Sequence, residues 1–373
     1  MRVLVTDGEQ KHTLGAVRAL GREGVHVVVG AGTRTALSFF SRHCAETFVY
    51  PSPARDEQGF LDSIFRAVRE KHIDVLLPIG YYANVLFSRH KDALLRVASL
   101  AIADFDAMAI ASDKERTMAF ADSVGVPIPR TYASADDVRD FPVVVKAATG
   151  MGLVTYVNSR AQLESMDFTD TVVQDYIPGA GFGFYGLFNR GELRAFFMHR
   201  RLREFPVTGG ASTAAAAFYD ERLKELGVRL MGALKWHGVA MVEVKRDERD
   251  GEYKLMEINP KFWGSLELSI AAGVNFPYLT CQMARNGDIE PVFDYDREMK
   301  FRWPFPQDLI HAIARPASAR QFVRDFGDPM MKTNLSLEDW IPSLYLLLTT
   351  PFEVARRVVR GRLFLPHGAP RIG

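Results

Sequence analysis

Short β-branched runs alternate with helical segments through the first hundred residues, and this alternation is the strongest constraint on the fold. "VHVVVG" and "DVLLPIG" are typical of buried strands, whereas "HTLGAVRALGREG" and "FLDSIFRAVREKH" have the spacing of amphipathic helices. Helical crossovers of this kind join parallel strands and cover both faces of the sheet. We therefore predict a doubly wound, parallel-sheet α/β domain over residues 1–111, with a final strand at "SLAIA".

The first strand is followed by "TDGEQKHTLG", which lacks the GxGxxG turn of a dinucleotide site. The 46 Lys and Arg residues nearly balance the 45 Asp and Glu residues, so a nucleic-acid partner is not expected. Cys44 and Cys281 form no zinc-ligand spacing and suit a reducing compartment. With no signal-peptide pattern at the N-terminus, we expect a cytoplasmic protein.

A helix start follows at "ASDKERTMAFADSVGVPIP". Ser112 is the expected N-cap, with Glu115 completing a capping box, and Gly125 and Pro127 end the segment. Lys114 in the first turn is unfavourable beside the positive end of a helix. This placement indicates a nearby anion, although a solvated lysine remains the alternative.

Lys146 follows the strand Val143–Val145 and precedes a loop of small residues, "AATGMG". Backbone amides in a glycine-containing loop can surround phosphate oxygens, and a neighbouring lysine supplies the opposite charge. A hairpin turn with a purely structural role is the alternative. The segment "QDYIPG", 22 residues after that loop, offers backbone polar groups and apolar side chains that suit an adenine ring.

Three arginines, Arg200, Arg201 and Arg203, end the strand in "GELRAFFMHRRLREF". In a regular strand Arg201 and Arg203 share one face and Arg200 lies on the other. Arginines beside a glycine loop suit the binding of phosphate or carboxylate, whereas a solvated charge run is the alternative.

The segment "VAMVEVKRDERDGEYKLMEINPKFWGS" predicts a β-hairpin. Glu243 and Glu257 lie across the hairpin, and Asn259 shares the face of Glu257. Two carboxylates and an amide oxygen repel each other unless a cation lies between them, and such ligands suit magnesium. A solvated hairpin face is the alternative, and Phe262 and Trp263 are expected to be exposed.

These motifs, in this order over residues 3–290, resemble the ATP-grasp superfamily, in the branch similar to the carbamoyl-phosphate synthase large chain and carboxylate-amine ligases. The resemblance implies a preATP-grasp α/β domain over 1–111. It also implies an α+β ATP-grasp domain over 112–292, with a small lobe at about 112–178 and a large lobe at about 179–292. Residues 293–373 form an extension of unknown role.

The resemblance also implies a role for each motif residue. Lys114 and Lys146 bind ATP phosphates, under a loop that contains Thr149, Gly150 and Gly152. The adenine hinge is formed by Gln174, Tyr176 and Ile177. Two magnesium ions are bound by Glu243, Glu257 and Asn259. The transferred phosphoryl group or the acceptor is contacted by Arg200, Arg201 or Arg203. Lys261 stands where many relatives carry an arginine that grips the substrate carboxylate, and no acid follows the hinge to hold the ribose.

The implied activity is formation of an amide or peptide bond through an acyl phosphate, with release of ADP and phosphate. The expected cofactors are ATP and two Mg²⁺ ions, with Mn²⁺ as a substitute, and the partners are a small carboxylic acid and an amine. The sequence does not fix which acid and amine bind, and a homodimer is left open. A small-molecule kinase and a non-catalytic ATP-sensing module are the alternatives.

The last segment, 293–373, carries no readable motif. Its apolar run "IPSLYLLLTTPF" is too short to span a bilayer and contains two prolines, so we expect it to pack on the body of the protein. "FEVARRVVRGRLFLPHG" is either a docked helix with solvated arginines or a basic amphipathic helix on a membrane surface. We expect the docked helix, and membrane contact is not expected.

Overall fold

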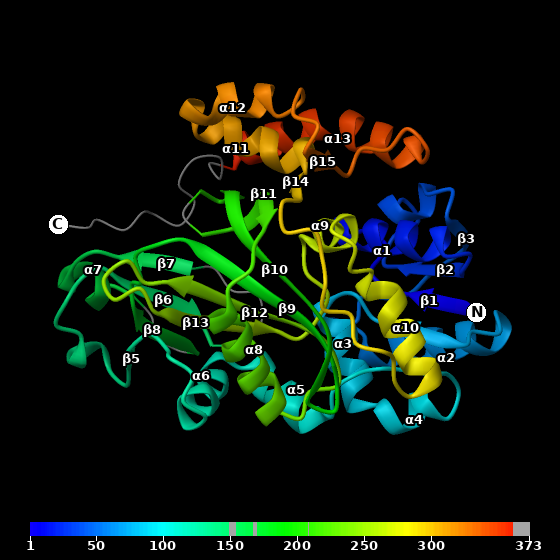
Figure 1. Cartoon of the computed structure of the whole chain (residues 1–373), viewed down its shortest axis with the longest axis horizontal. Helices are drawn as coiled ribbons and strands as arrows, with labels where there is room; N and C mark the ends of the chain where they lie inside the picture. Colours follow the sequence, from blue (N-terminus) through cyan, green and yellow to red (C-terminus); the bar gives the residue numbers. More distant parts are fainter. Residues whose placement is uncertain (149–153, 167–169, 208, 361–373) are drawn as a thin grey trace.

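Three β-sheets organise the chain in a computed structural model, which describes residues 1–148, 154–166, 170–207 and 209–360 (Figure 1). The first sheet is parallel, in the order β3-β2-β1-β4. Its strands are β1 (Arg2–Val5), β2 (His26–Ala31), β3 (Cys44–Val49) and β4 (Val75–Leu77). The accompanying helices are α1 (Lys11–Arg22), η1 (Leu37–Phe40), α2 (Glu57–Glu70), α3 (Tyr81–Arg89), α4 (Lys91–Leu95) and α5 (Phe105–Ser112). The predicted parallel α/β arrangement is confirmed.

The second sheet is antiparallel and small, in the order β5-β8-β6-β7. Its strands are β5 (Thr131–Tyr132), β6 (Val143–Ala147), β7 (Val154–Val157) and β8 (Thr171–Asp175). Nearby helices are α6 (Lys114–Ser123), η2 (Ala135–Asp137) and α7 (Arg160–Glu164). Valines from three of these strands pack into a core of their own, so this unit holds together apart from the other sheets.

The third sheet is the largest, in the order β13-β12-β9-β10-β11-β14-β15. Its strands are β9 (Gly181–Asn189), β10 (Glu192–Phe205), β11 (Ala211–Ala217), β12 (Gly238–Arg246), β13 (Tyr253–Asn259), β14 (Lys300–Arg302) and β15 (Met331–Thr333). Alternate residues of β9 enter two different cores, Phe184 on one face and Tyr185 on the other. Helix α8 (Glu221–Ala233) contributes to the first core, and α9 (Leu266–Ala271) and α10 (Phe276–Asn286) contribute to the second.

The C-terminal segment is joined to the body by strands as well as helices. β14 pairs with β11, and β15 pairs with β14, so both extend the large sheet. The helices are η3 (Pro304–Asp308), α11 (Leu309–Ala314), η4 (Pro316–Ser318), α12 (Ala319–Arg324) and α13 (Trp340–Val359). In Figure 1, α11, α12 and α13 form a layer at one end of the molecule. Within the described ranges, no helix has the length and apolar content needed to cross a membrane.

Three local expectations were wrong. Asp113, not Ser112, caps α6, because its carboxylate accepts a hydrogen bond from the Arg116 amide while Ser112 ends the preceding helix. "SLAIA" forms only a bridge between Ser99 and Val75 and no named strand. Phe262 and Trp263 are buried in the core between the first and third sheets, where apolar contact outweighs any need for exposure.

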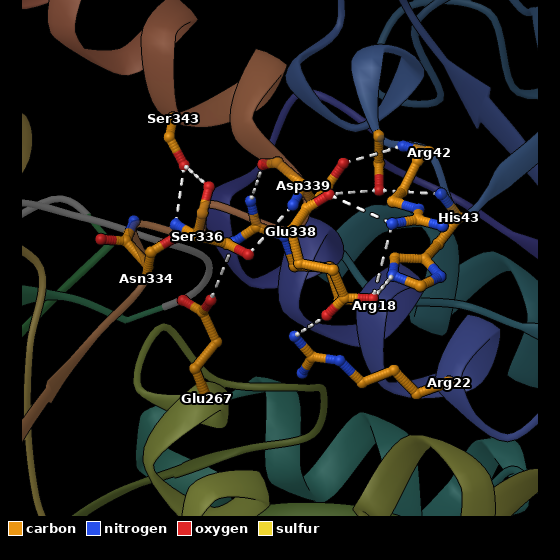
Figure 2. A network of polar contacts seen from close by, with 11 residues as sticks. Arg18, Arg22, Arg42, His43, Glu267, Asn334, Ser336, Glu338, Asp339 and Ser343 are labelled. Atoms are coloured by element: carbon orange, nitrogen blue, oxygen red, sulfur yellow. Dashed lines mark hydrogen bonds and ion pairs between the residues drawn. The ribbon is translucent and has the colours of Figure 1, made fainter.

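A buried ion pair fastens the C-terminal segment to the first domain (Figure 2). The Arg18 Nε of α1 lies 2.7 Å from the Asp339 carboxylate, and both side chains are almost fully buried. Asp339 also accepts hydrogen bonds from the Ser41 hydroxyl and the Arg42 amide, both at 2.8 Å. These three donors lower the pKa of the Asp339 carboxyl against the opposing effect of burial, so the carboxylate is held ionised. Asp339 therefore joins three segments that are far apart in the sequence.

We expect Asp339→Ala to lower the free energy of unfolding by about 3–5 kcal/mol, because the buried Arg18 guanidinium loses its carboxylate at 2.7 Å and is left with that of Glu267, at 4.0 Å. Urea unfolding followed by circular dichroism measures this loss. The neighbouring Glu338 is half exposed and lies 3.4–3.8 Å from Arg22, Arg42 and His43, so Glu338→Ala should cost less than about 1 kcal/mol. Equal losses in the two variants would contradict the role given to Asp339.

Candidate functional site

A cavity of about 710 Å³ lies where the small sheet faces the ends of β12 and β13. Residues from the first domain, the small sheet, the large sheet and the C-terminal segment all line it. Ten of the side chains singled out in the sequence are among them: Lys114, Lys146, Tyr176, Ile177, Arg201, Arg203, Glu243, Glu257, Asn259 and Lys261. The fold thus gathers most of the separate motifs around one space.

The predicted acidic platform is built on the β12–β13 hairpin. Glu243 and Glu257 are direct cross-strand neighbours in the antiparallel ladder, and Asn259 lies two residues farther along β13. The Asn259 amide donates a hydrogen bond of 2.7 Å to the Glu257 carboxylate, which leaves its carbonyl oxygen for another partner. Like charges placed directly opposite each other are destabilising in a sheet, so this pair needs cations nearby.

Arg201 supplies one of these cations from β10. Its guanidinium lies 2.5 Å from the Glu243 carboxylate and 3.2 Å from that of Glu204. Burial lowers the pKa of Arg201, but the two carboxylates more than offset this effect, so the guanidinium stays charged. Glu243 therefore faces one fixed cation on the side of β10.

Lys146 supplies a second cation from the small sheet. Burial lowers the pKa of its ammonium, while the Glu257 and Glu243 carboxylates oppose that shift. The Gln174 carbonyl oxygen accepts a hydrogen bond of 3.2 Å from the ammonium, and the Gln174 amide donates to Thr131. Gln174 is thus buried behind Lys146 and positions it, and it does not line the cavity.

Lys114 and Lys261 add positive charge at two further positions on the wall. The Lys114 amide donates a backbone hydrogen bond to Ala148, which places the start of α6 beside the end of β6. Lys114 also lowers the pKa of Lys146 through repulsion between the two ammonium groups. Burial lowers the pKa of Lys261, and the Glu257 and Glu243 carboxylates oppose the shift. The acidic platform is therefore surrounded by cations.

The hinge between β8 and β9 forms an apolar corner of the cavity. The Tyr156 and Tyr176 rings meet edge to face with centroids 5.8 Å apart. The Lys245 ammonium lies 4.8 Å from the centre of the Tyr176 ring and donates a hydrogen bond to the Ile177 carbonyl oxygen. A flat ring with polar edges fits between such aromatic and backbone groups.

The three candidate arginines have different surroundings in the structure. A β-bulge between Arg201 and Arg203 breaks the alternation on which their shared face depended. Arg203 contacts Asp308 at 2.8 Å and Asp325 at 2.5 Å, so its charge is already neutralised by the C-terminal segment. Arg200 is exposed and does not line the cavity. Thr149, Gly150 and Gly152 lie outside the described residues.

Several lining residues were missed in the sequence. Lys245 stands two positions after Glu243 on β12, so the two-residue period of a strand already placed it on the same face. His311 and Arg315 come from α11 and its C-cap, in a segment that carries no motif. The His311 ring contacts the Glu204 carbonyl oxygen at 2.7 Å, which anchors α11 to the end of β10.

The donor set suits a divalent cation with hard oxygen ligands. Glu243 and Glu257 provide carboxylates, and Asn259 provides a carbonyl oxygen on the same face. Among the residues that the structure describes, no group of three His, Cys, Asp or Glu side chains forms a complete metal cage. An incomplete protein shell fits magnesium, which keeps waters and takes phosphate oxygens as further ligands.

Comparison with known proteins gives a family match over part of the chain. Residues 167–303 match the family model "ATP-grasp in the biosynthetic pathway with Ter operon". Comparison with curated proteins gave no match. The fold resembles L-amino acid ligase from Bacillus licheniformis, with a TM-score of 0.63 and 19% identity over 78% of this chain and 77% of that one.

Two other solved structures are similar. N5-carboxyaminoimidazole synthetase from Staphylococcus aureus, complexed with ADP, gives a TM-score of 0.64 and 14% identity over 86% of each chain. The other is the biotin carboxylase domain dimer of 2-oxoglutarate carboxylase from Hydrogenobacter thermophilus, in complex with MgADP, ADP and bicarbonate. It gives a TM-score of 0.62 and 14% identity over 80% of this chain and 72% of that one. At these identities the likeness shows the fold.

Proposed function

We propose that this chain is an ATP-dependent carboxylate-amine ligase of the ATP-grasp superfamily, and its fold and the family match of residues 167–303 support this proposal. The observation that carries the proposal is the acidic platform of Glu243, Glu257 and Asn259, which shares one cavity with Lys146 and Lys261. A module that only senses a nucleotide needs no such arrangement of opposed carboxylates and cations. Phosphoryl transfer does need it.

The nucleotide is proposed to lie between the two lobes. The adenine would occupy the corner formed by Tyr156, Tyr176 and Ile177, where aromatic and backbone groups adjoin. The phosphates would extend toward Lys114 and Lys146, whose ammonium groups repel each other. Binding of ATP would thus relieve an existing repulsion.

Glu243, Glu257 and Asn259 would hold magnesium against the β and γ phosphates. The bound ions supply charge neutralisation for an in-line phosphoryl transfer. Arg201 would keep the Glu243 carboxylate oriented, because the two groups are already 2.5 Å apart. Lys261 would lie on the acceptor side and attract a substrate carboxylate.

The proposed product of the first step is an acyl phosphate. The carboxylate oxygen of the acid bonds to the γ phosphorus, and the bond to ADP breaks. An amine then attacks the acyl carbon, the carbon–oxygen bond to phosphate breaks, and the amine loses a proton. Because water destroys such an intermediate, a cavity lined by four parts of the chain supports this sequence of steps. His311 and Arg315 bring the C-terminal segment to this wall, where they would contact the acid or the amine.

A screen with ATP and magnesium tests the proposed function. We expect little ADP release from the protein alone and stimulated release with at least one amino acid or small carboxylic acid. Hydroxylamine added with that acid should yield a hydroxamate, because an acyl phosphate reacts with any strong amine nucleophile. A stable phosphorylated product without hydroxamate would indicate a kinase, and ATP binding without acid-stimulated turnover would indicate a sensing module.

Glu257→Gln should lower turnover roughly 100- to 1,000-fold while leaving ATP binding within about threefold, since the lost charge acts mainly on the transferred phosphoryl group. Calorimetry with a non-hydrolysable ATP analogue and an ADP-release assay measure the two effects. Glu252 lies on the same hairpin, does not line the cavity and is exposed, so Glu252→Gln is the matched control and should behave as the parent chain. Near-normal turnover of Glu257→Gln would show that the Glu257 carboxylate does not bind the metal.

Lys146→Met should instead raise the dissociation constant for ATP by roughly 10- to 100-fold, because a charge-assisted contact to phosphate is lost. The same calorimetric titration measures the change. Lys254→Met on β13 is the control, since Lys254 pairs with Asp250 and does not line the cavity. An unchanged affinity in Lys146→Met would return Lys146 to a structural role.

A further inference from the structure

Helix α13 is docked on the body by one face only. Leu346 packs with Leu14 and Leu37, and the Tyr345 ring stacks on Phe40 with centroids 5.4 Å apart. Pro342 and Thr350, four residues to either side of Leu346, are also buried. This side of the helix accounts for the docking expected from the sequence.

The opposite face of α13 is apolar and exposed. Ile341, Leu344, Leu348 and Phe352 recur at the spacing of one helical face, and Phe352 is 78% exposed. Leu347 and Trp340 flank this row and are exposed as well. Eight of the twenty exposed large hydrophobic side chains in the described part of the protein belong to α13. The surface is therefore a concentrated patch and not scattered exposure.

Positive charge follows this outer face toward the C-terminal end of the helix. Arg356 and Arg360 are exposed in its last turns, and Arg362 follows in the sequence. The nearby acid, Glu353, is only partly exposed and is engaged by Arg356 and Arg357. Residues 309–373 contain nine Lys and Arg against five Asp and Glu, a net charge of +4, whereas the whole chain carries +1. The remaining 308 residues are thus net negative, at −3, so the positive charge of the chain is concentrated in this C-terminal segment, which contains α13.

We propose that α13 docks the protein on the surface of a bilayer that contains anionic phospholipids. Its outer face would enter the boundary between headgroups and acyl chains, with Trp340 at one end and the arginines against the phosphates. The helix would lie along the surface, because its inner face remains packed on the body. An apolar row flanked by arginines matches an anionic lipid surface in both shape and charge.

Flotation of the full chain with vesicles tests the proposal. Vesicles of equal parts phosphatidylcholine and phosphatidylglycerol should carry the protein, whereas vesicles of phosphatidylcholine alone should carry far less. Salt should release it, because exposed charges are screened. Arg356→Gln with Arg360→Gln should lower the partition coefficient about 30-fold on the anionic vesicles.

Trp340 gives a direct spectroscopic signal. The other tryptophans, Trp236, Trp263 and Trp303, are at most 1% exposed, whereas Trp340 is 56% exposed. Tryptophan emission should therefore shift to shorter wavelength on the anionic vesicles as Trp340 leaves water. Trp340→Phe should abolish that shift, and a shift of equal size in this variant would contradict the proposed orientation.

Exposed side chains can be changed with little effect on folding. Leu344→Gln, Leu348→Gln and Phe352→Gln together should reduce vesicle binding by roughly 100-fold or more. The control is Leu95→Gln with Val97→Gln, which changes exposed apolar residues of the first domain and should leave binding unchanged. Unchanged circular dichroism and ATP affinity check that each variant is folded.

Three outcomes would overturn the proposal. The parent chain could fail to float with anionic vesicles, or the triple variant could float as well as the parent. Size-exclusion chromatography could show a dimer that the triple variant dissociates, with no vesicle binding by the parent, which would assign the face to a second copy of the chain. None of these outcomes depends on ligase activity, so the two proposals stand or fall separately.

Discussion

Electrostatic balance around Glu243 and Glu257 governs how the parts of this protein come together. Two carboxylates opposed in a β-ladder are tolerated only where cations face them, and here the cations come from three different elements. Arg201 belongs to β10, Lys146 to the small sheet and Lys261 to the segment after β13. The parts of the chain around the cavity are thus complementary in charge.

Arg201 and Arg203 both line the cavity, but they pair with acids from different parts of the chain. Arg201 faces Glu243, whereas the bulge beside it turns Arg203 toward the acids of the C-terminal segment. The same strand end therefore serves both the cavity and the attachment of η3 and α12. In a regular strand Arg201 and Arg203 would lie on the same face, and the β-bulge lets them contact different acids.

The sequence predicted the structure correctly where the two-residue period of a strand determines which side chains share a face. The hairpin of β12 and β13, the opposition of Glu243 and Glu257, and the strand leading to Lys146 follow from alternation and turn composition alone. The family resemblance then placed these pieces in the ATP-grasp fold, which the structural comparisons support.

The remaining features depend on contacts between residues far apart in the chain. Arg203 and Asp308 are 105 positions apart, and Arg18 and Asp339 are 321 apart, so no local pattern links them. The cap at Asp113 was displaced by one residue because Ser112 and Asp113 both suit that position and the neighbouring α5 decides between them. Burial of Trp263 likewise depends on Tyr185 and Phe276, which pack against its ring from other elements.

Asp308 and Asp325 come late in the chain, so the ribosome makes them well after β10. β10 leaves the ribosome about a hundred residues before the acids that neutralise Arg203, and β14 and β15 of the same sheet follow only at residues 300–302 and 331–333. Domains formed early in the chain can fold while translation continues. The small sheet, which has a core of its own, belongs to that class, whereas the large sheet acquires its final edge, and Arg203 and Arg18 their acidic partners, only near the end of translation.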